Sequence, residues 1–304
     1  MSPDLIAFAR AELAAAAPAP VIEAARVLAT QRGAGAALFY GSNLRTGSLD
    51  GVIDFYLLTP GPHRKGLHGF AEKFLWPEVS YHEVTAQGAT LRIKVATMPL
   101  SVFGAAAAGD KTDTTIWSRF TQPAALVWSA DTQTTSAVES AVANAMQTAA
   151  RFAALHGPER GAAEDYWNAL FRATYQAELR FEKPGRAKHI LSGNNARYES
   201  LLPLAWNSGG VRFSSDSTLL QPALSAAERK RLRSAWGWRQ FWGKALNAAR
   251  LFKAAFTFEG AARYAAWKVE RHTGVPIPVT RLSERFPVLI APTILWRLWR
   301  APRP

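Results

Sequence analysis

The stretch Leu38–Leu58 restricts the fold of this chain more than any other part of its sequence. An apolar run ends at Gly41-Ser42, a polar loop follows, and a second apolar run carries one acid, Asp54. This order predicts two buried strands with a Gly-Ser turn after the first. Glycine lets the backbone approach phosphate closely, and successive N–H groups with the Ser42 hydroxyl can bind phosphate oxygens. A carboxylate in the next strand can hold the hard cation that neutralises charge during phosphoryl transfer.

This layout is typical of nucleotidyltransferase active sites. In that pattern the second strand carries Asp-x-Asp, but Val52 stands at the first of these positions, so Asp54 is the candidate metal ligand. An acid within an apolar strand is costly to bury unless it is paired or bound to metal. Two alternatives therefore stay open: Gly41-Ser42 can be an ordinary turn, and Asp54 can belong to a core salt bridge.

The apolar periodicity predicts an α/β fold in three parts. We expect a nucleotidyltransferase-like domain with a mixed sheet at 1–133 and a mainly helical substrate domain at 134–224. A basic, Trp-rich amphipathic helical tail that associates with a membrane is expected at 225–304. Residues 207–222, next to the tail, are expected to form a polar linker. The strands expected in the first domain are 37–40, 52–58, 79–84, 91–97 and 124–129.

Composition excludes several classes of protein. The chain has 304 residues and is 48% apolar, which is enough for a full core and argues against disorder. It has no cysteine, which excludes disulfides, thiolate metal sites and cysteine nucleophiles. The apolar stretches are shorter than the roughly 20 residues that a membrane-spanning helix needs. With no signal peptide recognisable at the start, we expect a cytoplasmic protein.

Basic charge is concentrated in the last quarter of the chain. The net charge is +13, and from Ser225 onward there are 16 Lys or Arg against 4 Asp or Glu, together with six of the 11 Trp. Basic charge interleaved with Trp indicates binding to nucleic acid or to an anionic membrane surface. On a helix, Arg239, Arg250 and Lys253 group on one side and an aromatic stripe forms another. That helix can lie on a membrane or pack on the protein core. The stripe contains Trp238, Phe241, Trp242, Ala245, Ala249, Phe252 and Phe256.

Between about residues 35 and 205, a series of short matches appears in a consistent order. In this series the chain resembles the mitochondrial-type CDP-diacylglycerol synthases, which are phosphatidate cytidylyltransferases of the translocator assembly and maintenance type, and their bacterial relatives. Glu178 stands where that family has an Asp. The matches are Tyr40-Gly41-Ser42, Ile53-Asp54-Phe55, Lys94 followed by Ser101, then Tyr175, Glu178, Arg180 and Lys188.

The resemblance implies an enzyme of phospholipid synthesis that converts CTP and phosphatidic acid to CDP-diacylglycerol and pyrophosphate. It implies that Tyr40, Gly41 and Ser42 bind the nucleotide and that Asp54 binds Mg²⁺. Such a protein would be peripheral on the inner face of the cell membrane, with an anionic membrane surface as partner and no nucleic acid. The catalytic residues that it implies are Asp54, Lys94, Glu178, Arg180 and Lys188.

The residues themselves leave other interpretations open. Lys94, Arg180 and Lys188 can be solvated surface residues that bind no phosphate. The basic half of the chain can also serve a nucleotidyltransferase that acts on nucleic acid or on a small molecule. Finally, Val52 in place of an acid is compatible with a non-catalytic relative that uses its tail as a membrane adaptor.

Overall fold

A mixed β-sheet forms the centre of the N-terminal half. The computed structural model describes residues 2–61, 75–178, 191, 193–274, 278–280 and 284. In the described part, five strands pair in the order β3-β4-β2-β1-β5. Strands β2 and β4 run parallel, whereas the other neighbours are antiparallel. The strands are β1 (Ala36–Tyr40), β2 (Val52–Thr59), β3 (Glu78–Ala86), β4 (Ala89–Pro99) and β5 (Ala124–Ser129).

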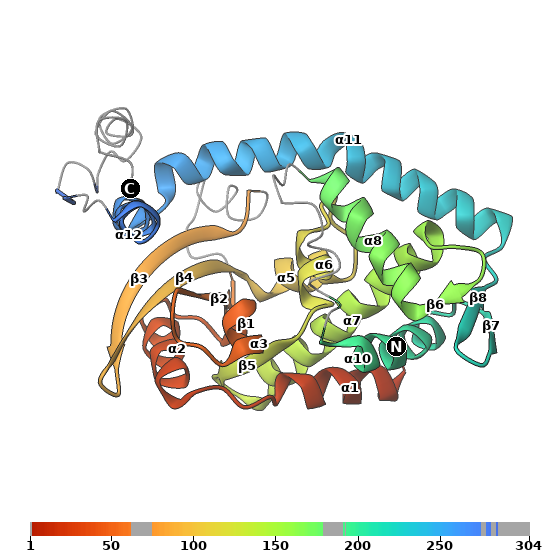
Figure 1. The fold of residues 1–304 in the computed structure, drawn as a ribbon, viewed down its shortest axis with the longest axis horizontal. Coiled ribbons are helices and arrows are strands. Elements are labelled where there is room, and N and C mark those ends of the chain that lie inside the picture. The colour runs from red at the N-terminus through yellow and green to blue at the C-terminus, as the bar shows by residue number, and fades with distance from the viewer. Residues whose placement is uncertain are drawn as a thin grey trace.

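One face of this sheet is covered by α2 (Ala19–Gln31), as Figure 1 shows. Successive side chains of a strand point to opposite faces, so every second residue shares a face. Phe39 of β1, Phe55 of β2 and Val95 of β4 are buried in the core cluster that includes α2 residues such as Leu28. These strands are apolar on this face, and a shift of their register by one residue would move these side chains to the opposite face at a large cost in free energy.

The opposite face carries a larger core. There the alternate positions Leu38, Tyr56 and Met98 pack with helices that follow the strands in sequence. The 25-residue helix α7 extends from this core into the helical half, so one continuous apolar cluster crosses the predicted domain boundary at residue 133. The helices are α1 (Pro3–Leu13), α5 (Leu100–Ala107), α6 (Thr115–Phe120) and α7 (Thr132–His156).

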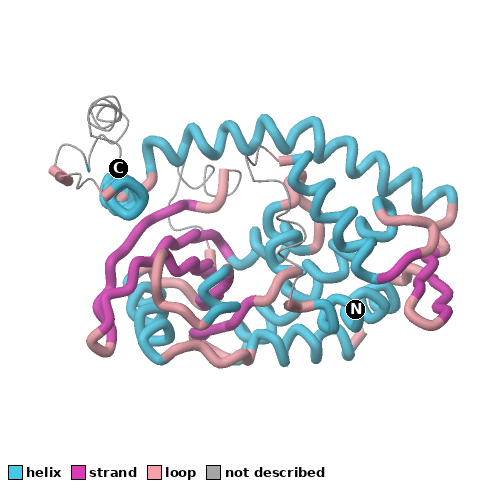
Figure 2. Tube along the Cα trace, viewed as in Figure 1, coloured by secondary structure: helices cyan, strands magenta, loops and turns pink. Residues whose placement is uncertain are grey.

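The rest of the central region is mainly helical, as the tube in Figure 2 shows. It contains α8 (Ala163–Ala177) and α10 (Asn195–Ser208), which pack on α7 and on each other. A small sheet in the order β6-β8-β7 lies beyond them. Its strands are β6 (Gly161–Ala162), β7 (Phe213–Asp216) and β8 (Leu219–Pro222).

Two helices of the basic tail complete the described part. Helix α11 (Ala226–Thr257) runs along most of the length of the molecule, and α12 (Ala261–Thr273) packs against β3 (Figure 1). Ser225 begins α11 as the N-cap of a capping box with Glu228. At the far end, the Tyr81 N–H donates to the Glu259 carbonyl at 2.8 Å, which joins the turn between the helices to β3.

The structure confirms the mixed α/β class and the five expected strands to within a few residues. The expected polar linker at 207–222 is wrong in part, because α10 extends to Ser208 and β7 and β8 form a hairpin in that segment. These strands are short and mostly exposed, which weakens their apolar signal. No helix in the described ranges is long and apolar enough to cross a membrane.

Candidate functional site

Three residues form a row across the middle of the main sheet. The register places Tyr40 of β1 opposite Asp54 of β2, and Asp54 beside Lys94 of β4. All three point to the face that carries the larger core. The Lys94 Nζ lies 3.3 Å from Asp54 Oδ1, and the two side chains remain 36% and 29% exposed. Because Ile53 and Phe55 on either side of Asp54 are fully buried, this is a polar, accessible position within an apolar sheet.

The turn after β1 brings backbone directly to the Asp54 carboxylate. Gly41 has φ +96°, and a Cβ added there would lie 3.3 Å from Asp54 Oδ2. Only glycine accepts this conformation and this approach without strain. Ser42 follows as the exposed first residue of the short helix α3 (Ser42–Thr46). The two residues predicted to cradle phosphate therefore lie beside the predicted metal ligand.

Asn43 fixes the loop that joins the two strands. Its buried Nδ2 donates to the carbonyls of Ser48 and Asp50 at 2.9 and 2.8 Å. The Ser42 hydroxyl donates to Asn43 Oδ1 over a longer 3.4 Å. Asp50 itself points away into solvent as an exposed loop residue. The Ser42 carbonyl also accepts from the Thr46 hydroxyl at 3.0 Å, so the loop holds Gly41 and Ser42 in place.

Arg119 on α6 is a site residue that the sequence did not indicate. Its guanidinium lies over the Tyr40 ring, 4.9 Å from the ring centre. Burial works to lower the pKa of Arg119, but Tyr40, Tyr56, Asp54 and Glu178 outweigh it and raise that pKa above its ordinary value. The guanidinium therefore keeps its positive charge although it is largely buried. The sequence shows only an arginine between Trp117 and Phe120 in a short apolar segment. An arginine that points to solvent would produce the same pattern, so the sequence could not identify Arg119 as a site residue.

Aromatic rings form the wall behind Arg119. The Tyr40 and Tyr56 ring centres are 5.4 Å apart, and Phe120 packs against both at 5.9 and 5.2 Å. The buried Arg119 Nε has no hydrogen-bond partner among the described residues. The quadrupole of an aromatic ring stabilises a cation that lies over its face, and this interaction can replace water on the side of the guanidinium that is buried. The arrangement leaves Arg119 fixed in position and partly exposed.

Glu178 reaches the same region from the end of α8. It is a buried carboxylate that accepts hydrogen bonds from the hydroxyls of Thr114 and Thr115, the latter at 3.3 Å. Asp113, one residue earlier, accepts from the Thr115 N–H at 3.0 Å at the start of α6. The segment 113–115 thus joins Glu178 to the helix that carries Arg119. The sequence placed Glu178 in the site only through the resemblance.

Two of the predicted catalytic residues, Arg180 and Lys188, lie outside the described residues. The structure brings together Tyr40, Gly41, Asp54 and Lys94 directly, and it joins Glu178 to the start of α6, the helix that carries Arg119. Within the described ranges, no three His, Asp or Glu side chains gather as a metal-binding group. Mg²⁺ commonly uses one or two carboxylates with substrate phosphates and water, so a single carboxylate beside a phosphate cradle fits that ion.

Comparison with known proteins does not assign this chain to a family. No protein-family model matches the chain, and no curated protein matches it at a significant level. Chemically, the site offers a carboxylate for a hard cation, backbone N–H groups at a glycine turn, and two cations, Lys94 and Arg119, on one sheet face. These groups suit a substrate with several phosphates.

Proposed function

We propose that the chain is a phosphatidate cytidylyltransferase, which makes CDP-diacylglycerol and pyrophosphate from CTP and phosphatidic acid for phospholipid synthesis. The observation that carries the proposal is the position of Asp54, between the Gly41 turn and Lys94 in a row across the sheet. The resemblance in residue order supports the lipid substrate. The geometry and the resemblance both depend on Gly41, Asp54 and Lys94, so variants of these residues test both.

In the proposed reaction, an oxygen of the phosphatidate phosphate attacks the α-phosphorus of CTP in line with the bond to the β-phosphate. A new P–O bond forms, the bond from the α-phosphorus to the bridging oxygen breaks, and pyrophosphate leaves with the electron pair. A phosphate monoester is already a nucleophile near neutral pH, so no dedicated general base is required. The protein's part is to position the phosphates and stabilise their charge.

The named residues have distinct parts in this proposal. Tyr40, Gly41 and Ser42 bind the triphosphate, with the close backbone approach at Gly41 as the structural basis. Lys94 binds phosphate oxygens, and for this it must exchange its contact with Asp54 for one with substrate. Arg180 and Lys188 keep their predicted part in orienting the lipid phosphate or the pyrophosphate.

Asp54 is the residue proposed to hold Mg²⁺. Its Oδ2 faces Gly41 while Oδ1 faces Lys94, so one oxygen points to the expected triphosphate position. The ion, when bound, offsets charge on the triphosphate and the leaving pyrophosphate. Glu178 stays hydrogen-bonded to Thr114 and Thr115 in the structure and is proposed to position Arg119.

A lipid substrate stays in its bilayer, so the proposed enzyme must work at a membrane surface. We propose a peripheral location on the inner face of the cell membrane, with the basic tail as the attachment. The terminal run 286–299, with its two Trp, was expected to contribute but lies outside the described residues.

The decisive experiment supplies labelled CTP, Mg²⁺ and phosphatidic acid in mixed micelles and looks for a lipid-soluble product. Asp54→Asn should lower turnover by about 100-fold or more, since it removes a charge that acts on the phosphates. Its stability should change by less than about 1 kcal/mol, because partly exposed ion pairs contribute little. Asp50→Asn, four residues away in the loop, is the matched control and should keep full activity.

One observation favours a non-catalytic relative instead. Val52, at the place of the missing acid, lies opposite Arg92 of β4, so no carboxylate joins Asp54 from that position. If the wild-type protein binds no nucleoside triphosphate in the presence of Mg²⁺, this alternative replaces the proposal. Salt-sensitive binding to RNA, with product formed on nucleic acid or a small molecule and none on lipid, would support the other nucleotidyltransferase alternative.

A further inference from the structure

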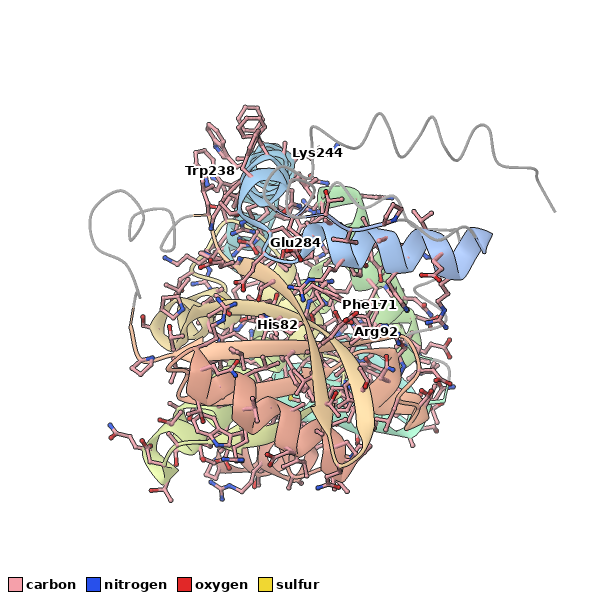
Figure 3. All side chains as sticks on the ribbon, turned by 90° about the vertical axis from the view of Figure 1, so that its left-hand side faces the viewer. His82, Arg92, Phe171, Trp238, Lys244 and Glu284 are labelled. Atoms are coloured by element: carbon pink, nitrogen blue, oxygen red, sulfur yellow. The ribbon has the colours of Figure 1, made fainter. Side chains whose placement is uncertain are left out.

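Helix α11 exposes a row of large apolar side chains along its outer side. Every exposed Trp or Phe of the described part lies here, for example Phe241 at 72% and Phe252 at 71% exposure. Trp238 projects from the top of the molecule in Figure 3, away from the body of the protein. We call this set the aromatic ridge, and its members are Trp238, Phe241, Trp242, Leu251, Phe252 and Phe256.

The aromatic members of the ridge contact one another in two groups. The Trp238 and Trp242 rings are 5.8 Å apart, Phe241 and Trp242 are 5.2 Å apart, and Phe252 and Phe256 are 5.1 Å apart. A surface helix of a water-soluble protein normally turns its apolar stripe to the core and its charges to water. An exposed apolar patch of this kind marks an interaction site.

Three basic residues of this helix face the protein instead. Arg239 is buried, donates to the Gly109 carbonyl and lies 5.0 Å over the Phe152 ring. Arg250 donates to Asp113 at 2.9 Å, and Lys253 donates to the Leu75 carbonyl at 2.9 Å. These three side chains therefore hold the helix to the protein, and within the described ranges the aromatic ridge stays exposed.

Charge around the ridge indicates which partner covers it. Lys230, Arg231 and Arg233 are exposed near the start of α11, and Lys244, which stands between the two aromatic groups in sequence, is also exposed. From Arg229 to Phe258 the sequence contains no acid. Aromatic residues beside basic ones, on a helix about 48 Å long at 1.5 Å per residue, match a flat anionic surface. A long convex ridge has the shape to enter the headgroup layer of a bilayer, where Trp residues are favoured.

We propose that the aromatic ridge of α11 docks onto an anionic lipid bilayer, with α11 lying in the plane of the surface. Docking stands on the ridge and its surrounding charge; its effect on turnover rests on the proposed function. The inward residue Arg250 binds Asp113, and the adjacent Thr114 and Thr115 bind Glu178. The docked helix is thus in contact with the segment that supports the candidate site, which keeps that site close to the membrane surface.

The test uses the full chain with vesicles of phosphatidylcholine, alone or mixed with phosphatidic acid or phosphatidylglycerol, followed by flotation. The wild-type protein should float with the anionic vesicles, and less so at high salt. The double variant F241S/F252S should bind at least about tenfold more weakly, because two apolar side chains no longer enter the bilayer. The matched control I22S/L219S changes two exposed apolar residues elsewhere and should bind like the wild type.

Three outcomes would overturn the proposal. Wild-type protein that floats with no vesicle excludes docking, and equal binding by F241S/F252S excludes the ridge. A dimer of the wild type that becomes a monomer in F241S/F252S, without vesicle binding, would assign the ridge to a second copy of the chain. Activity on short-chain, water-soluble phosphatidic acid tests the proposed function independently of docking. If the wild type lacks this activity, the proposed function is contradicted, whereas the result on vesicle binding still stands.

Discussion

At the scale of single residues, the site depends on one glycine. Gly41 combines φ +96° with a close approach to the Asp54 carboxylate. Gly47, six residues later, also has a positive φ of +69°, but an added Cβ there meets nothing within 4 Å. Substituting alanine at Gly47 introduces backbone strain alone, whereas substituting it at Gly41 introduces strain and also crowds the candidate site, so comparing the two variants distinguishes these effects.

We expect Gly41→Ala to lower the free energy of unfolding by about 1–3 kcal/mol and to displace the Asp54 carboxylate. Gly47→Ala should carry only the strain of a left-handed backbone, roughly 1–2 kcal/mol. Urea unfolding measures both. Binding of CTP with Mg²⁺ should be lost in Gly41→Ala alone, and equal binding by the two variants would contradict the phosphate cradle.

Arg119 gives a second prediction at this scale. Its guanidinium lies over the Tyr40 ring, and Tyr40 is opposite Asp54 in the sheet, so Arg119 is placed to bind a phosphate held at Asp54. Arg119→Met should weaken triphosphate binding by roughly 10–100-fold, since charge-assisted hydrogen bonds contribute about 1.5–3 kcal/mol each. Arg119→Lys should fall between, because lysine keeps the charge without the planar fork. Calorimetric titration measures the affinity.

The control for Arg119 is Arg45→Met. Arg45 is exposed at the end of α3, close in sequence to the Gly-Ser turn. Its loss should leave triphosphate affinity almost unchanged. If Arg119→Met binds triphosphate as tightly as the wild type, Arg119 is a structural residue that only neutralises Asp54 and Glu178.

At the scale of elements, α11 is bound to the protein through a buried ion pair. Arg250 and Asp113 have side chains only 11% and 2% exposed, and the guanidinium lies 3.9 Å over the Trp76 ring. Asp113 also accepts from the Thr115 N–H at the start of α6. One carboxylate therefore connects the long helix to the short helix that carries Arg119.

We predict that Arg250→Leu destabilises the protein by about 3–5 kcal/mol, because it leaves the buried Asp113 charge unpaired. Arg233→Leu, an exposed change on the same helix, should stay within about 0.5 kcal/mol of the wild type. Denaturant unfolding compares them. The double variant R250L/D113L should recover part of the loss, and no recovery would mean that the pairing of the charges is not the cause.

At the scale of the whole molecule, two half-buried histidines predict how stability depends on pH. Burial and the nearby Arg32 lower the pKa of His82, and burial lowers the pKa of His156. His82 lies where α2, β3 and the end of α11 meet, with Glu259 as the opposing charge. Both groups favour the neutral form in the folded protein.

The sign follows from proton linkage. The unfolded chain, with ordinary histidine pKa values near 6.5, binds more protons than the folded chain as the pH falls below that value. Stability should therefore be full above about pH 6.5 and should decrease on acidification. Thermal unfolding from pH 7.5 to 5.5 tests this, and the double variant H82N/H156F should show a flatter dependence. An unchanged slope in that variant would assign the acid sensitivity to other groups.

The sequence by itself determined the five strands of the main sheet and their order along the chain. Apolar runs at 37–40, 52–58 and 91–97 predicted the strands that the structure has as β1, β2 and β4, because a two-residue period or a continuous apolar run leaves few alternatives. The sequence also predicted the Gly-Ser turn and singled out Asp54, because a glycine at the end of an apolar run and a lone acid within an apolar strand are both uncommon. The hairpin at β7 and β8 escaped because its exposed strands carry little apolar signal.

Only the tertiary structure decided which groups meet. Arg119 joins the site because α6 packs beside β1, and Lys94 faces Asp54 because β4 pairs in parallel with β2. For α11, the periodicity predicted two faces but could not choose the inward one. That choice depends on partners distant in sequence, above all Asp113 and the Gly109 carbonyl, which bind the arginines and leave the aromatic ridge outside. Side-chain pattern sets local structure, whereas pairing between distant segments sets the site and the surface.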